Sequence, residues 1–333
     1  MKKILLIATG GTIASQGSSD GLTPQISSEE LLSYVPDVKK FCTVDAIQVL
    51  NIDSTNIQPE YWLVIANAVR ENYDKYDGFV ICHGTDTMAY SCAAISYLVQ
   101  NSKKPIILTG AQKPIDLEVT DARTNLFDSL LYACHPNAHG VCLVFDGKVI
   151  AGSRTRKVRS KSYNAFESIN YPIIATIHDG RVIQYINDMP YAEAPTFYDT
   201  LCSSVFLLKL IPGVTPDILA MIAEKYDAII IESYGVGGIP NDDKRNFLAE
   251  IERLVKKGKI IVVTTQVMHE GSDMNVYAVG HVAKERYGLM ESFDMTTEAT
   301  VTKLMWILGQ TKDPETIKSM FYTTINRDIL FQG

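Results

Sequence analysis

The chain of 333 residues lacks three features that would place it in whole classes of proteins. It has no apolar run near the ~20 residues of a membrane-spanning helix, so no membrane partner is predicted. It has no excess of positive charge, and a net charge of -7 argues against nucleic acid as its main partner. Its six cysteines have no C-x-x-C spacing and several lie in apolar runs, which predicts reduced core thiols rather than disulfides.

Motifs for metal and phosphate binding are also missing. His135 and His139 have a proline between them, and His269 has no second histidine at the spacing of H-E-x-x-H. Residues 10–12 (GGT) fit neither the Walker A pattern nor the G-x-G-x-x-G dinucleotide fingerprint. The sequence therefore predicts no metal site and no bound nucleotide.

The chain does contain an alternation of short apolar runs and helical periods. The runs that indicate strands occupy residues 3–8, 44–51, 78–82, 105–109 and 141–145. Such runs are typical of parallel strands buried on both faces. Between them, apolar residues recur with a 3.6-residue period after Pro59, Thr87 and Asp121. The sequence therefore predicts an α/β fold with mainly parallel sheets and right-handed crossovers.

Residues 185–203 interrupt this alternation with two prolines, several acids and no clear period, which is typical of a linker. The alternation then resumes, with strands expected at 205–210, 228–231 and 260–263 and helices from Thr215, from Asp242 and around 301–308. The length of the chain also suggests roughly two domains. We therefore predict one α/β domain over residues 1–184 and a second over 204–333.

Two motifs place hydroxyl groups where predicted strands end. Residues 9–14 (TGGTIA) follow the apolar run 4–7, and residues 83–88 (HGTDTM) follow the run 79–82. Open α/β sheets bind their ligands at the carboxyl ends of strands. Two hydroxyls and a carboxylate at that edge suggest a nucleophile, a proton relay and an anchor for a cationic substrate group.

Each of these residues can have either a catalytic or binding role or a purely structural one. Thr12 could present its hydroxyl to a cleft beside oxyanion-stabilising N–H groups, or it could cap the segment that follows a glycine-rich turn. Thr85 and Asp86 could move a proton and hold an ammonium group, or they could be ordinary helix N-caps. The sequence alone leaves both interpretations open.

A threonine nucleophile needs a base, and the basic run 154–161 is a candidate source. By default such a run is a solvated face, and a phosphate-binding patch is a second interpretation. One of its lysines, desolvated beside Thr85 and Asp86, could act as the base, although desolvation favours neutral lysine and a carboxylate favours charged lysine. Residues 53–55 (DST) follow another strand and could bind a carboxylate or form a polar turn.

Taken together, the two motifs resemble the two signatures of the bacterial-type L-asparaginase family, and the pair is far more specific than either half. The resemblance covers nearly the whole chain and includes the segments 53–55, 153–157, 166–168, 233–237 and 294–300. It implies a larger N-terminal domain of the Rossmann or flavodoxin type, a linker and a smaller C-terminal domain.

The resemblance also implies a reaction and a set of roles. L-asparagine would be hydrolysed to L-aspartate and ammonia, without a metal or organic cofactor. Thr12 would be the nucleophile that forms a β-aspartyl enzyme. Thr85, Asp86 and Lys157 would form a second catalytic group, in which Thr85 and Lys157 move protons or activate water and Asp86 also holds the α-ammonium. The residues implied to bind substrate are Gly11, Asp53, Ser54, Thr55, Gly84 and Ala111, with residues 53–55 on the α-carboxylate and ammonium side and Ala111 near the side-chain amide.

The apolar run after Met1 is too short for a secretory leader and is broken by residues 10–12, so a first strand fits it better. With no signal peptide, the chain is most similar to the cytoplasmic (type I) branch of the family. The resemblance implies a homodimer or a homotetramer with active sites near the subunit contacts. Cytoplasmic members can carry a separate activating asparagine site, which the sequence does not place.

One position departs from the family pattern. Many members have a tyrosine about ten residues after the nucleophile, in a flexible loop, where it helps to activate the nucleophile. Leu22 stands in the matching stretch 20–24 and cannot transfer a proton. Either another group substitutes for the tyrosine or the loop acts only as a lid.

Three alternatives to a dedicated asparaginase follow. A glutaminase-asparaginase of broader specificity would use the same site. A glutaminyl-tRNA-forming amidotransferase subunit shares the fold but carries an additional N-terminal domain, whereas the Thr12 motif begins here within a dozen residues of Met1. A non-catalytic amino-acid-binding protein is supported by Leu22 alone.

Overall fold

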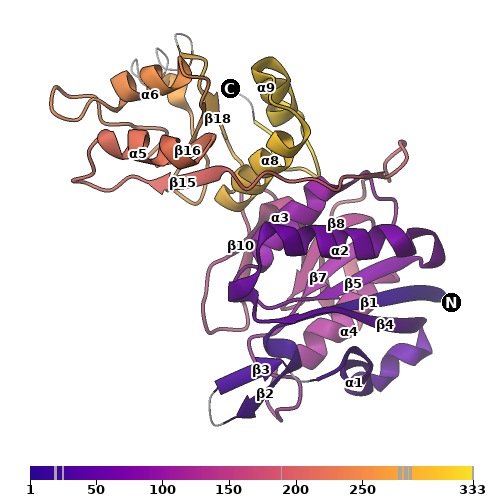
Figure 1. Ribbon diagram of the computed structural model, residues 1–333. Helices are drawn as coiled ribbons and strands as arrows, with labels where there is room; N and C mark the ends of the chain where they lie inside the picture. Colours follow the sequence, from indigo (N-terminus) through magenta and orange to yellow (C-terminus); the bar gives the residue numbers. More distant parts are fainter. Residues whose placement is uncertain are drawn as a thin grey trace. The chain divides into compact units, whose positions relative to one another are not determined.

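The structure is a computed structural model that describes residues 1–333 except 19, 20, 25, 189, 277–279, 281–283, 285, 286, 332 and 333 (Figure 1). It divides into two compact units, Met1–Asp199 and Thr200–Gly333. The division falls inside the stretch 185–203 that we expected to link two domains, and the exact domain limits stay a prediction. Part of that stretch pairs within the first unit, where β14 (Thr196–Phe197) forms an antiparallel ladder with β6 (Val99–Gln100).

The sheet of the N-terminal unit has the strand order β13-β12-β9-β8-β7-β5-β1-β4. Its parallel part consists of β4 (Cys42–Ile52), β1 (Lys2–Gly10), β5 (Gly78–Cys82), β7 (Pro105–Thr109) and β8 (Gly140–Phe145). Counted along the chain, these strands stand in the order second, first, third, fourth and fifth. That is the flavodoxin-like doubly wound order, so the predicted fold class is confirmed for this unit.

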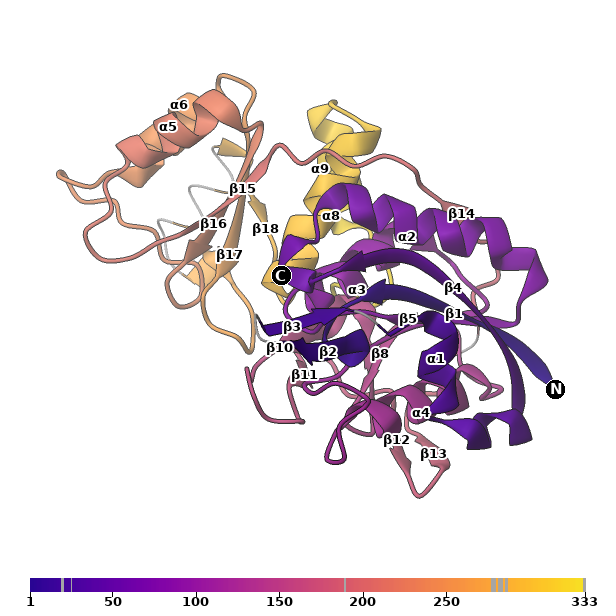
Figure 2. The same ribbon diagram turned by 60° about the horizontal axis from the view of Figure 1, so that its bottom comes forward.

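Helices cover both faces of this sheet. They are α1 (Ser28–Ser33) and α4 (Ala122–Ala133) on one face and α2 (Pro59–Asn72) and α3 (Met88–Leu98) on the other (Figures 1 and 2). Strands β5, β7 and β8 are buried throughout, as their continuous apolar runs predicted. The burial of both faces leaves the strand ends as the place where polar groups can meet a ligand.

Antiparallel strands extend the sheet beyond what the sequence predicted. They are β9 (Lys148–Ala151), β12 (Ala175–His178) and β13 (Arg181–Gln184). The turn between β12 and β13 is Asp179-Gly180, with φ of 50° and 67°, which suits a two-residue hairpin loop. A separate hairpin pairs β10 (Thr155–Lys157) with β11 (Phe166–Ser168). The sheet is therefore mixed, with a parallel centre.

The C-terminal unit is a smaller α/β unit with the parallel strand order β15-β16-β17-β18. Its strands are β15 (Val205–Lys209), β16 (Ala228–Ser233), β17 (Ile260–Thr265) and β18 (Met290–Glu291), and its helices include α5 (Asp217–Lys225), α6 (Phe247–Val255), α8 (Thr297–Gln310) and α9 (Pro314–Tyr322). The helix expected from Asp242 begins only at Phe247. The carboxylate of Asp242 instead accepts the N–H groups of Lys244 and Arg245 in a turn, and Asn246 caps the helix.

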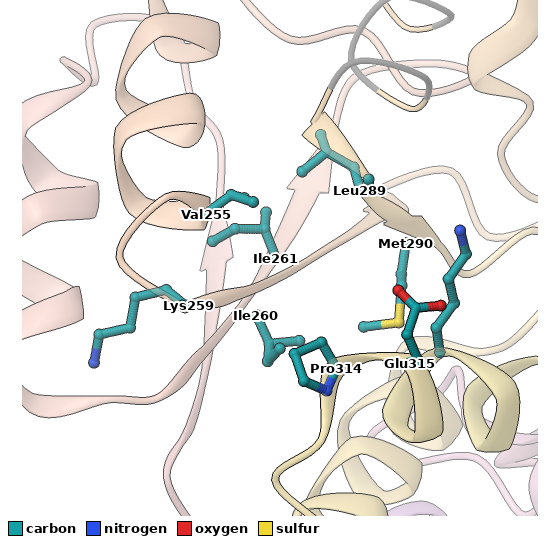
Figure 3. Close-up of a pocket in the computed structure, with 11 residues that line it drawn as sticks. Val255, Lys259, Ile260, Ile261, Leu289, Met290, Pro314 and Glu315 are labelled. Carbon is teal, nitrogen blue, oxygen red and sulfur yellow. The ribbon is translucent and has the colours of Figure 1, made fainter.

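A pocket of about 150 Å³ opens in this second unit at the amino ends of β17 and β18. Figure 3 shows Ile260, Ile261, Leu289 and Met290 in its wall, beside Pro314 at the start of α9. Parallel sheets bind ligands at the opposite, carboxyl ends of their strands. This pocket is therefore not a candidate for the site that the two motifs indicate.

The cysteines and the lengths of the helices bear on two further expectations from the sequence. All six cysteines are free thiols, and Cys42, Cys82, Cys92 and Cys142 are buried. In the part of the chain that the structure describes, no helix combines the length and the apolar character needed to cross a membrane.

Candidate active site

The two hydroxyl motifs follow neighbouring strands. β1 and β5 pair in parallel, with Ala8 opposite Cys82. From β1 the chain passes to β4 on one side and then to β5 on the other, so the strand order reverses at this point. Ligands of doubly wound sheets bind at the carboxyl ends of strands at such a reversal. The candidate site therefore lies at the edge where residues 11–12 and 84–86 emerge.

The backbones of the two motifs are in close contact. Gly11 has a φ of +80°, and a Cβ built on it would lie 2.4 Å from the backbone N of Gly84. A Cβ built on Gly84 would lie 2.6 Å from Oγ of Ser54. Glycine is required at both positions because a side chain would overlap these atoms. Thr12 and Thr85 directly follow these glycines and so lie at adjoining strand ends.

Lys157 joins Thr85 to Asp86. Its Nζ donates to Thr85 Oγ1 at 2.8 Å and to Asp86 Oδ1 at 2.6 Å. The lysine side chain is only 15 % exposed, whereas that of Asp86 is 57 % exposed. Asp86 can therefore accept a second cationic group from the solvent side while it keeps Lys157 in place.

Gln112 is a partner of Thr85 that the sequence did not single out as functional. The Thr85 hydroxyl donates to Gln112 Oε1 at 3.1 Å, so that its oxygen is left to accept from Lys157. The backbone N–H of Gln112 donates to the Asp121 carboxylate at 2.9 Å. Burial raises the pKa of Asp121, and the N–H donors act in the opposite direction. The sequence feature that could have indicated Gln112 is its position directly after Ala111, in the loop that follows β7.

Residues 53–55 form a polar turn that supports the second motif. Asp53 Oδ1 accepts from the backbone N–H of Thr55 at 2.8 Å and from its hydroxyl at 2.7 Å. Ser54 is 4 % exposed, and its Oγ accepts from the backbone N–H of Asp86 at 3.3 Å. Asp53 and Thr55 are exposed and so accessible to a ligand. Ser54 acts by holding the loop that carries Asp86.

The capping interpretations of the two threonine motifs do not describe the structure. Helix α3 has Thr87 at its N-cap, so neither Thr85 nor Asp86 caps it. Thr12 is half-buried at the start of a short 3-10 turn, and no described residue forms a hydrogen bond with its hydroxyl. These hydroxyl and carboxylate groups are therefore available for chemistry.

Ala111 and Leu22 bring no polar side chain to the site. The side chain of Ala111 is fully buried in the core, so only its backbone groups can reach a ligand. Leu22 lies on β3 (Gly21–Pro24), which pairs with β2 (Ser15–Ser18) in a hairpin shortly after Thr12. The side chain of Leu22 lies outside what the structure describes.

The basic run 154–161 is not simply a solvated face, which corrects our default expectation. Arg154 is fully buried, and its guanidinium carbon lies 5.8 Å from the ring centroid of Tyr171. Arg159 is exposed and pairs with Glu167 at 2.9 Å. Arg154 ends the 3-10 turn η5 (Gly152–Arg154) before β10, and Arg159 lies after β10, so charge along the run does not predict exposure.

His83 lies buried beneath the Thr85 loop and takes part in a chain of hydrogen bonds. Its Nδ1 lies 2.7 Å from the carbonyl oxygen of Gly84, which can only accept, so Nδ1 carries the hydrogen. Nε2 then accepts from the Ser91 hydroxyl at 2.9 Å, and Ser91 Oγ accepts from Trp62 Nε1 at 2.9 Å. Burial lowers the pKa of His83 to about 4. The neutral ring thus fixes the backbone of the second motif.

This burial predicts a pH dependence of stability. The unfolded histidine binds a proton near pH 6.5, and the folded one does so only near pH 4, so stability is lost as the pH falls through this window. The loss should reach about 2.5 kcal/mol at pH ~4.5. In His83→Asn, urea unfolding should show a destabilisation at neutral pH that shrinks on acidification. His178→Asn, at the exposed end of β12, is the control and should leave the slope unchanged. An equal slope in wild type and His83→Asn would refute the prediction.

Within the ranges that the structure describes, no group of three or more histidine, cysteine, aspartate or glutamate side chains is placed to hold a metal ion. The doubly wound sheet and the contacts of Lys157 with Thr85 and Asp86 instead indicate the class of protein to which the chain belongs. This class is the α/β enzymes that place hydroxyl, lysine and carboxylate groups together at the carboxyl ends of parallel strands.

Comparison with known proteins narrows this class. Residues 3–190 match the family model for the N-terminal domain of asparaginase, and residues 204–321 match that for the glutaminase/asparaginase C-terminal domain. The chain is 40 % identical to an L-asparaginase of Thermococcus kodakarensis over 98 % of this chain and 99 % of the relative. The solved structure of that thermostable L-asparaginase superposes with a TM-score of 0.92 over 99 % of this chain and 100 % of the other. L-asparaginase 1 of Escherichia coli is 34 % identical over 95 % of both chains. A glutamyl-tRNA(Gln) amidotransferase subunit from Metallosphaera sedula is 32 % identical over 97 % of this chain and 76 % of its own length.

The chain belongs to the asparaginase family and is an amidohydrolase. The resemblance seen in the two sequence motifs is thereby confirmed at the level of the family and of both domains.

Proposed function

We propose that this protein hydrolyses L-asparagine to L-aspartate and ammonia through a β-aspartyl ester on Thr12. The observation that carries the proposal is the placement of Lys157 Nζ on both Thr85 Oγ1 and Asp86 Oδ1, at the strand end that Gly11 and Gly84 bring against Thr12. This arrangement supplies a nucleophile, a proton-transfer pair and an anion for the substrate ammonium.

The reaction proceeds in two displacements. Oγ of Thr12 forms a bond to the side-chain amide carbon, the carbon–nitrogen bond breaks, and the nitrogen leaves as ammonia after it takes up a proton. Water then cleaves the ester, which releases aspartate and restores the Thr12 hydroxyl. Each step moves one proton on or off an oxygen, which is the work of a general acid–base pair.

The Thr85–Lys157 pair is suited to this proton transfer. The Lys157 amine lies 2.8 Å from the Thr85 oxygen, so in its neutral form it can take the Thr85 proton, and the ammonium so formed can supply a proton to the leaving nitrogen. Gln112 holds that hydroxyl in one direction until the proton is needed. Asp86 fixes Lys157 and keeps an exposed face for the α-ammonium, while Asp53 and Thr55 line the side of the α-carboxylate and α-ammonium.

The proton of Thr12 must leave by a route that does not involve residue 22. A leucine side chain carries no group that exchanges a proton, so Leu22 takes no part in acid–base chemistry. We assign removal of the Thr12 proton to the Thr85–Lys157 pair: Thr85 accepts it, directly or through one water, as it passes its own proton to the neutral amine of Lys157.

The amidotransferase relative favours a second candidate, in which glutamine is the amide that is cleaved. The whole site described above would serve glutamine equally if the pocket accepted one more methylene. One methylene of difference between two substrates changes the ratio of their kcat/KM values by only about 10–200-fold, so the two substrates must be compared directly.

Ammonia release from purified protein with L-asparagine and, separately, L-glutamine tests these candidates. We expect release from asparagine to exceed that from glutamine at least ~10-fold in kcat/KM. Equal rates would indicate a broader glutaminase-asparaginase, and release from glutamine alone would favour the amidotransferase type. Calorimetric binding of asparagine without ammonia release would instead indicate a binding protein.

We also infer a cytoplasmic location and self-association into a dimer or tetramer, as the family resemblance implied. Relatives of the cytoplasmic type support the location, since one solved structure at 26 % identity and a TM-score of 0.83 is a probable cytoplasmic L-asparaginase of Campylobacter jejuni. Analytical ultracentrifugation of the full chain tests the assembly, and a monomer at micromolar concentration would contradict it.

A further inference from the structure

A second pocket in the N-terminal unit lies beside α4, and no step of the proposed reaction uses it. It has a volume of about 470 Å³, within the range of sites that take small organic molecules. Three segments form it: residues 34–37, residues 123, 124, 127 and 128 of α4, and residues 177–180, where β12 ends and the turn to β13 begins. We call it the Asp128 pocket, after the residue that distinguishes it.

Asp128 is a buried carboxyl group without a partner. The residue is 6 % exposed, and no described residue forms a hydrogen bond or an ion pair with it. Burial alone raises its pKa to about 7. An unpaired carboxyl in such a place is unfavourable to stability, so its presence needs a reason other than packing.

The other charged groups around the pocket do not compensate Asp128. On the 3-10 turn η2 (Pro36–Lys40), Asp37 pairs with Lys40 at 2.6 Å. On α4, Arg123 donates to the carbonyl oxygens of Ile115 and Leu117 and stacks on Tyr34, with its guanidinium carbon 5.7 Å from the ring centroid.

His178, the last residue of β12, and Asp179, in the turn that follows, are both exposed. Neither residue contributes to the shifted pKa of Asp128, whose cause is burial alone. Among the described residues of the pocket wall, Asp128 is therefore the buried charge that lacks a counter-ion.

We propose that the Asp128 pocket binds a small molecule that carries a primary ammonium group on an apolar body. The ammonium donates to the Asp128 carboxylate and supplies the missing counter-charge. The apolar body packs on Phe127, Val35 and Ile177, and Tyr34 adds an aromatic face that attracts cations. Ca²⁺ and Mg²⁺ fit poorly, because these ions take six or more oxygen ligands and the buried wall offers one carboxylate.

Isothermal titration calorimetry with benzylammonium as the probe and neutral benzyl alcohol as its uncharged match tests this proposal. We expect benzylammonium to bind with a Kd in the millimolar range or tighter at pH ~8.5, and benzyl alcohol to bind at least ~10-fold more weakly. At pH ~5.5 the affinity should fall by roughly 30-fold, because Asp128 is then mostly protonated.

Two variants separate Asp128 from the rest of the pocket. Asp128→Asn should abolish binding of benzylammonium, and it should fold at least as stably as wild type at pH ~8 because it removes an unpaired buried charge. Asp37→Asn removes a carboxylate of the same wall that already has a partner, and it should leave binding within ~2-fold. Equal affinity for probe and alcohol, retained affinity in Asp128→Asn, or no binding by wild type at ~20 mM probe would each overturn the proposal.

Discussion

Replacement of Thr12 by alanine is expected to lower kcat for ammonia release ~10⁴-fold or more and to leave the fold intact. The reason is that, in the proposed mechanism, the oxygen of this hydroxyl is the atom that forms the acyl bond. The stability should change little, because no described residue forms a hydrogen bond with that hydroxyl and the residue is only half-buried. We expect the melting temperature to stay within about 2 °C of wild type. Steady-state kinetics and thermal melts on the same samples measure both quantities.

Two matched variants test whether the loss of activity comes from the Thr12 oxygen itself. Thr12→Ser keeps the oxygen and should keep measurable turnover. Thr9→Ala removes a hydroxyl from the same motif that donates to the carbonyl oxygen of Cys82 at 2.9 Å, so it should lose about 1 kcal/mol of stability and retain most of its kcat. Thr12 cannot be the nucleophile if a folded Thr12→Ala protein keeps more than about 1 % of wild-type kcat.

The parallel centre of the N-terminal sheet could be predicted because its strands are continuous apolar runs. Residues 78–82 and 105–109 are buried on both faces, and their boundaries in the structure match those expected from sequence. The antiparallel extension could not be predicted in the same way. β13 alternates exposed and half-buried residues over only four positions, too few for a period to stand out, although Asp179-Gly180 is a hairpin signal.

The candidate site was predictable as two motifs but not as a set of contacts. Lys157 reaches Thr85 across 72 positions of sequence, from a hairpin strand that has no apolar run of its own. The charge run around Lys157 gave no sign that Arg154 is buried while Arg159 is solvated. Gln112 stands in the loop after β7, and only the folded chain shows that its amide oxygen accepts from Thr85. Tertiary pairing therefore sets these contacts, and the local sequence pattern does not indicate them.

Lys157→Met is expected to reduce kcat by about 10²–10⁴-fold, the range for loss of a general acid–base group. Methionine keeps much of the length and apolar volume of lysine, so the change isolates the ammonium group. Without it, Thr85 loses the donor at 2.8 Å that stabilises negative charge on its oxygen, and Asp86 loses its partner at 2.6 Å. Lys157→Arg should lose activity as well, because a planar guanidinium cannot replace the single compact ammonium that donates to both Thr85 Oγ1 and Asp86 Oδ1. Rates of the formation and hydrolysis of the acyl-enzyme, measured separately by rapid quench, should both fall.

Arg159→Met is the matched control for the loss of a positive charge from the same run. Arg159 is exposed and binds the carbonyl oxygen of Asn164 and the carboxylate of Glu167, away from the threonines. We expect its kcat within ~2-fold of wild type and a stability change below ~1 kcal/mol. If Lys157→Met also kept its kcat within ~2-fold of wild type, Lys157 would only hold the loop of Asp86 in place, and the proton of Thr12 would need another acceptor. If both variants lost activity alike, the overall positive charge of the run would be responsible, through long-range attraction that high salt should weaken.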